Sequence, residues 1–172
     1  MTKPTLYLFV GYPGAGKTTV ARIIAEQTGA VHIWADNERQ KLFAVPDHSY
    51  QESRQLYDYL NHKTDQLLAA GKSVIYDTNF NFKRDREMMR AIATKHKAAT
   101  VLIWMTTPID IARTRAIEDS HGKDSRIWGN MPASEFKRIS HNLQPPTEDE
   151  RPITFDGTNL DPTLVKQNLG IA

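Results

Sequence analysis

The chain carries the octapeptide Gly11-Tyr12-Pro13-Gly14-Ala15-Gly16-Lys17-Thr18, which matches G-x-x-x-x-G-K-[ST] at every fixed position. The apolar run 6–10 precedes this octapeptide and predicts a buried strand, and from Val20 on apolar residues recur at helical spacing. A strand, a glycine-rich turn and a helix in this order separate a phosphate-binding loop from a chance match in a surface turn. We therefore expect this stretch to bind a nucleoside triphosphate.

Each residue type in the octapeptide suits the binding of phosphate. Glycines let the backbone curl until successive N–H groups point at phosphate oxygens, and the following helix adds its unpaired amides and its dipole. Lys17 is expected to reach the β- and γ-phosphates, and the Thr18 hydroxyl is expected to ligate Mg²⁺. With Thr19 added, the predicted ATP-binding stretch runs from Gly11 to Thr19.

The amino-acid composition limits which classes of protein this chain can belong to. The 172 residues suit one domain, and 40% hydrophobic with 24% charged residues is an ordinary globular profile. The net charge of +2 gives no global basic field for nucleic acid, and without cysteine the chain forms no disulfide or thiolate metal site. The six histidines lack the spacing of metal ligands. Because the N-terminus shows no signal peptide or membrane span, we expect a cytoplasmic protein.

Apolar runs and turn signals alternate along the chain. Strands are expected at the apolar runs 6–10, 31–34, 73–76, 100–105 and 153–155. Helices are expected after the octapeptide and at about 36–43, 50–70, 83–96, 107–119, 132–142 and from 161 on. Strands separated by helices predict an α/β fold, a three-layer P-loop NTPase with a five-stranded parallel sheet, formed by a single domain over 1–172.

Local signals refine these elements. Asp36 and Thr107-Pro108 are expected to cap the helices that they precede. The stretch 120–131 predicts a mobile loop between two helices of a lid at about 113–142, and 145–150 predicts a polar connector. The expected core stripe of the helix 50–70 consists of Leu56, Tyr59, Leu60, Lys63 and Leu67.

Polar residues that directly follow a strand are candidates for the site, because ligands of an open parallel sheet lie at the carboxyl ends of its strands. After the second strand come Asp36 and Arg39, one helical turn apart on the same rim as the octapeptide. A carboxylate there can act as general base on an acceptor hydroxyl near the γ-phosphate. The alternative is that Asp36 only caps its helix.

The third strand leads into Asp77-Thr78-Asn79. An apolar strand that ends in aspartate is the second mark of nucleotide enzymes, in which the carboxylate holds Mg²⁺ or one of its waters. P-loop ATPases that hydrolyse with water commonly place glutamate next, whereas this chain has Thr78, and the guanine-reading N-K-x-D is absent from the sequence. These features favour transfer to a bound hydroxyl over a motor or a GTP switch.

Arginines follow the fourth strand: Arg113 and Arg115 in the next predicted helix and Arg126 in the predicted loop. Phosphoryl transfer spreads negative charge over the equatorial oxygens, and an arginine on a closing lid stabilises that charge while closure excludes water. Arg115 and Arg126 are therefore catalytic candidates, and Arg113 is a candidate ATP ligand. The alternative for each is a solvated helix face paired with a neighbouring carboxylate.

Three blocks of the sequence resemble the 5′-polynucleotide kinase branch of the P-loop kinases, with an AAA_33-type ATP-binding domain. The blocks are GYPGAGKTT at 11–19, ADNERQ at 35–40 and DTNFN at 77–81, followed by Arg84. Their order and spacing agree with that family over roughly residues 5–145. Zeta-toxin-like and antibiotic kinases share parts of the second and third blocks.

The resemblance implies roles for the site residues, with ATP and Mg²⁺ as cofactors. Asp36 would be the general base, Arg39 would bind a phosphate of the acceptor, and Asp77 would help to hold the acceptor side. The predicted catalytic residues are Lys17, Asp36, Arg115 and Arg126; the acceptor-binding residues are Asp36, Arg39, Asp77, Thr78 and Asn79; the metal ligands are Thr18 and Asp77.

The leading hypothesis is an ATP-dependent kinase that acts on a hydroxyl, with the 5′-OH of a polynucleotide as the first candidate. The family tends to place two basic residues one turn apart at the lid, whereas here Asp119 follows Arg115, so the lid arginine stays open among Arg113, Arg115 and Arg126. The low net charge and the lack of a second catalytic domain keep a nucleoside, sugar or antibiotic acceptor as an alternative. A P-loop ATPase or regulatory ATP-binding protein without acceptor is the third hypothesis. The sequence carries no signal for an oligomeric state.

Overall fold

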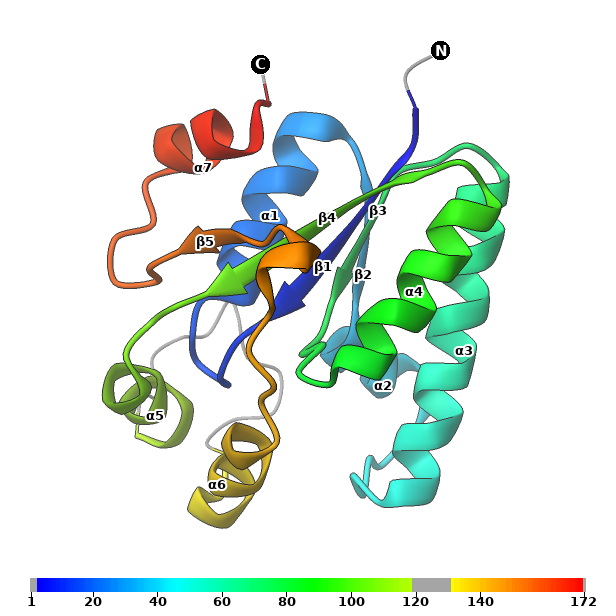
Figure 1. Ribbon diagram of the computed structural model, residues 1–172. Coiled ribbons are helices and arrows are strands. Elements are labelled where there is room, and N and C mark those ends of the chain that lie inside the picture. The colour runs from blue at the N-terminus through cyan, green and yellow to red at the C-terminus, as the bar shows by residue number, and fades with distance from the viewer. Residues whose placement is uncertain (1–2, 119–130, 172) are drawn as a thin grey trace.

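The computed structural model describes residues 3–118 and 131–171 (Figure 1). Within these ranges five strands form one parallel sheet in the order β2-β3-β1-β4-β5. The strands are β1 (Thr5–Val10), β2 (Val31–Trp34), β3 (Val74–Asp77), β4 (Ala99–Met105) and β5 (Ile153–Phe155). The helices are α1 (Lys17–Thr28), α2 (Ala35–Leu42), α3 (Tyr50–Ala69), α4 (Lys83–Lys95), α5 (Ile109–Ile117), α6 (Ala133–His141), the 3-10 helix η1 (Glu148–Glu150) and α7 (Pro162–Leu169). The predicted α/β fold with a five-stranded parallel sheet is confirmed.

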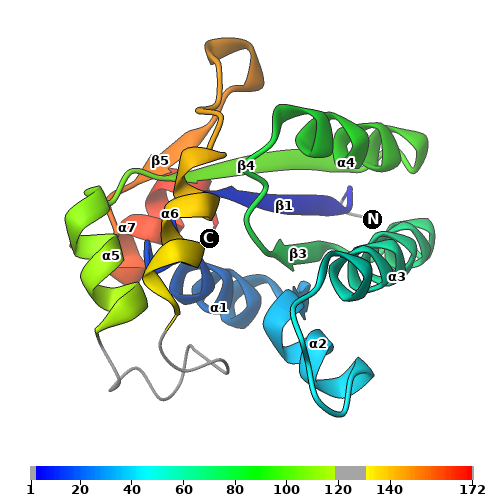
Figure 2. The same cartoon turned by 90° about the horizontal axis from the view of Figure 1, so that it is seen from below.

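Helices cover both faces of the sheet, α3 and α4 on one face and α1 and α7 on the other (Figures 1 and 2). The central strand β1 contributes to both cores, because side chains alternate along a strand. Leu6, Leu8 and Val10 pack into the cluster under α3 and α4. Tyr7 and Phe9 pack into the cluster under α1 and α7. From Leu6 to Val10, β1 is therefore buried on both faces of the sheet.

The carboxyl ends of the strands meet at one edge of the sheet, which Figure 2 views from below. Trp34 at the end of β2 lies beside Asp77 at the end of β3, and Val10 at the end of β1 lies beside Trp104 of β4. Helices α2, α5 and α6 lie beyond this edge (Figure 1). The loops that follow the strands therefore converge on one side of the molecule.

Two predicted helix caps are wrong. β2 continues directly into α2, so the cap position falls on Trp34, which makes no side-chain capping bond, and Asp36 lies in the first turn of the helix. α5 begins at Ile109 with Pro108 as its N-cap, and Thr107 makes no capping bond. In both places a side chain that local preference assigns to a cap lies elsewhere.

The buried stripe of α3 also differs from the predicted one. It consists of Glu52, Leu56, Leu60, Thr64 and Leu68. The predicted member Tyr59 is 42% exposed. The stripe includes polar residues whose bonds are satisfied inside the protein, as when Thr64 Oγ1 donates to the Leu60 carbonyl at 2.8 Å. A stripe traced through large apolar residues therefore rotates away from the true core face.

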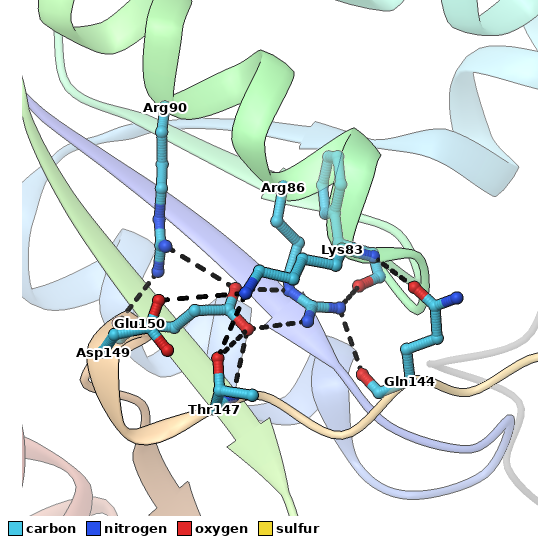
Figure 3. Close-up of polar contacts among 8 residues, drawn as sticks. Lys83, Arg86, Arg90, Gln144, Thr147, Asp149 and Glu150 are labelled. Carbon is cyan, nitrogen blue, oxygen red and sulfur yellow. Dashed lines mark hydrogen bonds and ion pairs between the residues drawn. The ribbon is translucent and has the colours of Figure 1, made fainter.

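The predicted polar connector 145–150 contains a buried ion pair (Figure 3). Arg86 of α4 binds Glu150 of η1 through Nε–Oε1 at 2.7 Å and Nη2–Oε2 at 2.8 Å, and both side chains are fully buried. Arg86 Nη1 also donates to the carbonyls of Phe80 and Gln144, at 3.0 and 3.2 Å. The connector is thus fixed to α4 rather than being a solvated link.

The predicted lid at about 113–142 contains the second half of α5 and the whole of α6. The predicted loop 120–131, with Arg126, lies outside the described residues except for Met131. The Met131 N–H donates to the Ala116 carbonyl at 3.0 Å, so the chain enters α6 beside the end of α5. No helix in the described ranges is both long and apolar enough to cross a membrane.

Candidate active site

A cavity of about 1330 Å³ lies at the carboxyl edge of the sheet. Its wall is formed by the P-loop (residues 11–18), α2, the N-terminal half of α3, the loop after β3, and parts of α5 and α6. A single small-molecule site typically measures about 300–1,000 Å³, so this cavity has room for a nucleotide and an acceptor together. The predicted site residues on its wall are Pro13, Gly14, Gly16, Lys17, Thr18, Thr19, Asp36, Arg39, Asp77, Thr78, Asn79 and Arg115.

The P-loop has the conformation that phosphate binding requires. Gly14 and Gly16 have φ values of 80° and 100°, in the left-handed region that favours glycine. Gly16 is also the N-cap of α1, so the amides of the first helical turn face the loop. Lys17 Nζ donates to the carbonyls of Gly11 and Tyr12, at 3.0 and 2.7 Å, which holds the ammonium group over the loop.

Thr107 and Gly157, which the sequence analysis did not identify as site residues, contact the backbone of the P-loop. Thr107 Oγ1 donates to the Ala15 carbonyl at 2.7 Å and accepts from the Gly157 N–H at 2.9 Å. A Cβ added to Gly157 would lie 2.0 Å from the Ala15 carbonyl oxygen, so only glycine fits there. Thr107 and Gly157 each follow a strand, β4 and β5, which is the positional signal that could have identified them.

Asn81 fixes the start of the P-loop from the other side. Its Oδ1 accepts from the Gly11 N–H at 3.2 Å, and its backbone carbonyl accepts from the Gln144 N–H at 2.9 Å. The neighbouring Phe80 N–H donates to the Phe9 carbonyl at 2.8 Å. The loop after β3 is therefore bonded to the P-loop and to the segment that follows α6. Gly11, Tyr12 and Ala15 are not on the cavity wall and serve the loop through backbone contacts of this kind.

Asp36 and Arg39 lie on the cavity wall in different environments. Asp36 is exposed, whereas Arg39 is buried. Arg39 Nη1 forms an ion pair with the buried Glu52 of α3, and its Nη2 donates to Ser53 Oγ at 3.3 Å. The Arg39 charge is thus balanced by Glu52, while the guanidinium has further N–H groups to offer, because it carries five donors.

Asp77 and Thr18 are oxygen donors on the cavity wall that fit a magnesium ion. Asp77 is 3% exposed, and its Oδ2 accepts from His32 Nε2 at 3.0 Å, which fixes the orientation of the carboxylate. Mg²⁺ is usually held by one or two protein oxygens together with phosphate oxygens and waters. No group of three or more His, Cys, Asp or Glu side chains in the described ranges could form an all-protein metal site. Thr18 and Asp77 would supply one hydroxyl and one carboxylate oxygen to such an ion.

Tyr57 of α3 is a further polar residue on the wall that the sequence analysis did not single out. Its hydroxyl lies 3.2 Å from Thr78 Oγ1. Burial raises the pKa of Tyr57 above its ordinary value, and the negative charge of Asp36 acts in the same direction. The helical periodicity of α3 identified the apolar neighbours of Tyr57. The position of Tyr57 on the cavity wall can be recognised only from the three-dimensional structure.

The predicted lid arginines lie in different places relative to the cavity. Arg115 lies on the cavity wall, and its Nη1 donates to the Gly157 carbonyl at 2.9 Å. Arg113 is not on the wall; its side chain is 51% exposed and lies 3.6 Å from Glu118. Arg126 lies outside the described residues. Arg138 of α6 is an additional arginine on the wall, and its ion pair with Glu135 lowers the pKa of that carboxyl.

Comparison with known proteins agrees with this arrangement. The model of the AAA_33 family, an AAA domain, matches residues 6–146. Shikimate kinase of Persephonella marina is 27% identical over 136 residues, which cover 78% of this chain and 77% of that protein. The structure of a candidate kinase from Chloroflexus aurantiacus J-10-fl has a TM-score of 0.77 at 21% identity, over 99% of this chain and 96% of that one.

A chain of the Pnkp1/Rnl/Hen1 RNA repair complex has a TM-score of 0.67 at 20% identity, over 88% of this chain and 46% of that one. At these identities the two structures show the common fold. The family match covers most of the chain, and the predicted class, a phosphotransferase of the P-loop kinase type, is confirmed. The chain therefore belongs to the AAA_33 family, as a P-loop kinase domain.

Proposed function

We propose that the protein transfers the γ-phosphate of ATP to a hydroxyl group of an acceptor that lies against α3. The observation that carries this proposal is the single cavity wall shared by the P-loop, Asp36 and α3. The P-loop amides and Lys17 bind the β- and γ-phosphates, and Lys17 exchanges the carbonyls of its own loop for phosphate oxygens. Arg115 stabilises charge on the transferred group, and α5 and α6 flank the cavity as the lid.

Asp36 is the proposed general base. The acceptor hydroxyl gives its proton to the Asp36 carboxylate while its oxygen forms a bond to the γ-phosphorus. The bond between this phosphorus and the β–γ bridging oxygen breaks, and its electron pair leaves with ADP. Asp36 lies in the first turn of α2 and on the cavity wall, which is where a base for the acceptor hydroxyl is needed.

The proposed metal ligands are Thr18 and Asp77, with Mg²⁺ as the ion. When bound, the ion neutralises phosphate charge during transfer. His32 holds Asp77 in place through the contact of 3.0 Å, and the P-loop holds Thr18 at the start of α1. Thr18, Asp77 and Lys17 all belong to the cavity wall, so the two oxygen ligands share the cavity with the ammonium group.

The first proposed acceptor is the 5′-OH of a polynucleotide. The supporting features are Asp36 and Arg39 after β2 and the residues 77–79 after β3, which resemble the 5′-polynucleotide kinases. In this case the N–H groups that Glu52 and Ser53 leave available on Arg39 contact a phosphate next to the reacting hydroxyl. The fold likeness to a chain of an RNA repair complex is compatible with this acceptor.

A small hydroxyl compound is the second candidate, and the ion pair of Arg39 with Glu52 is compatible with it. Because a buried carboxylate already balances the Arg39 charge, this part of the wall suits a neutral acceptor as well as a phosphorylated one. The sequence relative in Persephonella marina, a shikimate kinase, also acts on a small molecule.

The proposed function is tested by a transfer screen with γ-labelled ATP. The acceptors are 5′-hydroxyl DNA and RNA oligonucleotides, nucleosides, shikimate and simple sugars, and Lys17→Ala protein is the blank. We expect label on one acceptor class with the wild type and none with the blank. ATP hydrolysis without transfer to any acceptor would instead support a P-loop ATPase.

A further inference from the structure

Tyr57 has a fixed position at the boundary between the core and the cavity. Its ring packs against the hydrophobic cluster under α3 and α4, so packing sets the direction of the side chain. Its hydroxyl lies 3.2 Å from Thr78 Oγ1, and both residues are on the cavity wall with Asp36. A rigid ring that ends in a polar group places this group with little loss of conformational entropy.

The charges around Tyr57 leave the two hydroxyls neutral. Glu52 balances the charge of Arg39, which also hydrogen-bonds to the Tyr57 side chain and acts to lower the pKa of Tyr57. Burial raises the pKa of Tyr57, and it therefore stays protonated at neutral pH. A tyrosine and a threonine hydroxyl can each donate and accept hydrogen bonds, which is the pattern that complements another hydroxyl or an ether oxygen.

We infer that Tyr57 and Thr78 bind a second oxygen of the acceptor, next to the hydroxyl that Asp36 deprotonates. The acceptor class is then a sugar or sugar-like polyol, either free or as the terminal ribose or deoxyribose of a nucleic acid. This inference rests on the proposed kinase function and adds a specificity-determining pair to it. The reacting hydroxyl is left to Asp36, because donation from Tyr57 to that oxygen would lower its nucleophilicity.

The alternative is that Tyr57 is a core residue whose hydroxyl only satisfies Thr78. Tyr57→Phe distinguishes the two roles, since it keeps the ring and removes one oxygen. Tyr59→Phe is the matched control, because Tyr59 lies on the same helix, is 42% exposed and is not on the cavity wall. Thr78→Ser, which keeps the hydroxyl, and Thr78→Val, which removes it, form a second pair.

The readouts are kcat and KM for the best acceptor of the transfer screen, the Kd for ATP, and the melting temperature. We expect Tyr57→Phe and Thr78→Val to raise the acceptor KM by about tenfold or more. The Kd for ATP should stay within about twofold, Tyr59→Phe should resemble the wild type, and Thr78→Ser should raise the acceptor KM less than Thr78→Val does. An unchanged acceptor KM in Tyr57→Phe, or an equal loss of ATP binding, would overturn the inference.

An acceptor analogue sharpens this test. The wild type should prefer the acceptor over the analogue that lacks the hydroxyl or ring oxygen next to the reacting group, and Tyr57→Phe should abolish most of this preference. Equal preferences in both proteins would assign Tyr57 to the core. If the wild type hydrolyses ATP but phosphorylates no acceptor, the proposed kinase function is wrong. If the wild type phosphorylates the acceptor and Tyr57→Phe does so at the normal rate, only the inference about Tyr57 is wrong.

Discussion

Arg86 and Glu150 form a bidentate ion pair in which both side chains are fully buried, although β4, α5 and α6 lie between them in the sequence. The pair joins the start of α4 to η1, just before β5 (Figure 3). Arg90 adds a bond from its Nη2 to the Glu150 carbonyl at 2.8 Å. Because loss of the Glu150 charge would leave the buried Arg86 charge without its carboxylate partner, this pair should govern acid stability.

The first prediction concerns pH. The hydrogen bonds from Arg86 lower the pKa of Glu150 from 4.5 to about 2 in the folded protein. A carboxyl with a lowered pKa contributes its stabilisation above the pKa of the unfolded chain and loses it as the pH falls towards the folded value. We expect about 3 kcal/mol of unfolding free energy to disappear between roughly pH 5 and pH 2.

Urea unfolding of the wild type and Glu150→Gln from pH 7 to pH 2.5 measures this effect. The advantage of the wild type over the variant should shrink as the pH falls. Glu148→Gln, an exposed change in the same 3-10 helix, should leave the pH dependence as in the wild type. Parallel curves for wild type and Glu150→Gln would show that this ion pair does not control the acid limb.

The second prediction concerns Lys17. Lys17→Ala should lower phosphoryl transfer at least roughly a hundredfold, because the β- and γ-phosphates lose their ammonium contact. The fold should be retained, since the bonds of Nζ to the Gly11 and Tyr12 carbonyls lie within the P-loop. Transfer assays and circular dichroism of Lys17→Ala and the control Lys95→Ala check this. Turnover near that of the wild type would rule out the assigned phosphate site.

The third prediction separates catalysis from helix capping at Asp36. Asp36→Asn should lower transfer by roughly 10²–10⁴ while the ATP affinity changes only a few-fold, as expected for loss of a general base. The melting temperature should change little, because the N-cap of α2 is Trp34. Single-turnover transfer, equilibrium binding of ATP and thermal unfolding are measured together. Full activity in Asp36→Asn would exclude it as the base.

The fourth prediction concerns the support behind the P-loop. Gly157→Ala places a methyl group 2.0 Å from the Ala15 carbonyl oxygen, so the loop must shift. We expect weaker ATP binding and a lower melting temperature. Thr107→Val should act in the same direction, because it breaks the bonds of 2.7 and 2.9 Å, and Thr107→Ser should restore both properties. Normal ATP binding by Gly157→Ala would mean that the loop tolerates the displacement.

The fifth prediction tests Arg39 as an acceptor ligand. Arg39→Ala leaves Glu52 buried without its partner, which should cost about 3–5 kcal/mol of stability. The double variant Arg39→Met with Glu52→Gln avoids this unpaired charge. In that variant, use of a 3′-phosphorylated nucleotide should fall about tenfold or more relative to the unphosphorylated nucleoside. An equal change for both acceptors would assign Arg39 to the fold and favour the small-molecule kinase.

The fold, the P-loop and the residues that directly follow β2 and β3 were predictable from local patterns. The octapeptide at 11–18 and the apolar runs predicted the parallel sheet. Short stretches of sequence are enough for this, because a strand buried on both faces is a continuous apolar run and a phosphate-binding turn needs glycines at fixed positions. The strand-end rule placed Asp36 and residues 77–79 on the cavity wall. What local preference misassigned were the helix caps, since β2 passes into α2 without an intervening residue.

The contacts between distant segments were not predictable. Glu52 and Glu150 each end an S/T-x-x-E pattern, which indicates the start of a helix but does not identify a buried arginine partner. Their partners Arg39 and Arg86 are 13 and 64 residues away. Tyr57 faces the cavity only because α3 packs with Leu56 and Leu60 towards the sheet. Such pairings depend on the three-dimensional packing, which a single sequence does not display.

Asn81 links local unfolding at the start of the P-loop to local unfolding of the segment that follows α6. It bonds to the Gly11 N–H through its side chain and to the Gln144 N–H through its backbone, so these amides share one anchor. An opening that displaces the Asn81 backbone removes both acceptors, so it exposes both amides to solvent together. We therefore expect ATP binding to raise the hydrogen-exchange protection of the Gly11 and Gln144 amides together.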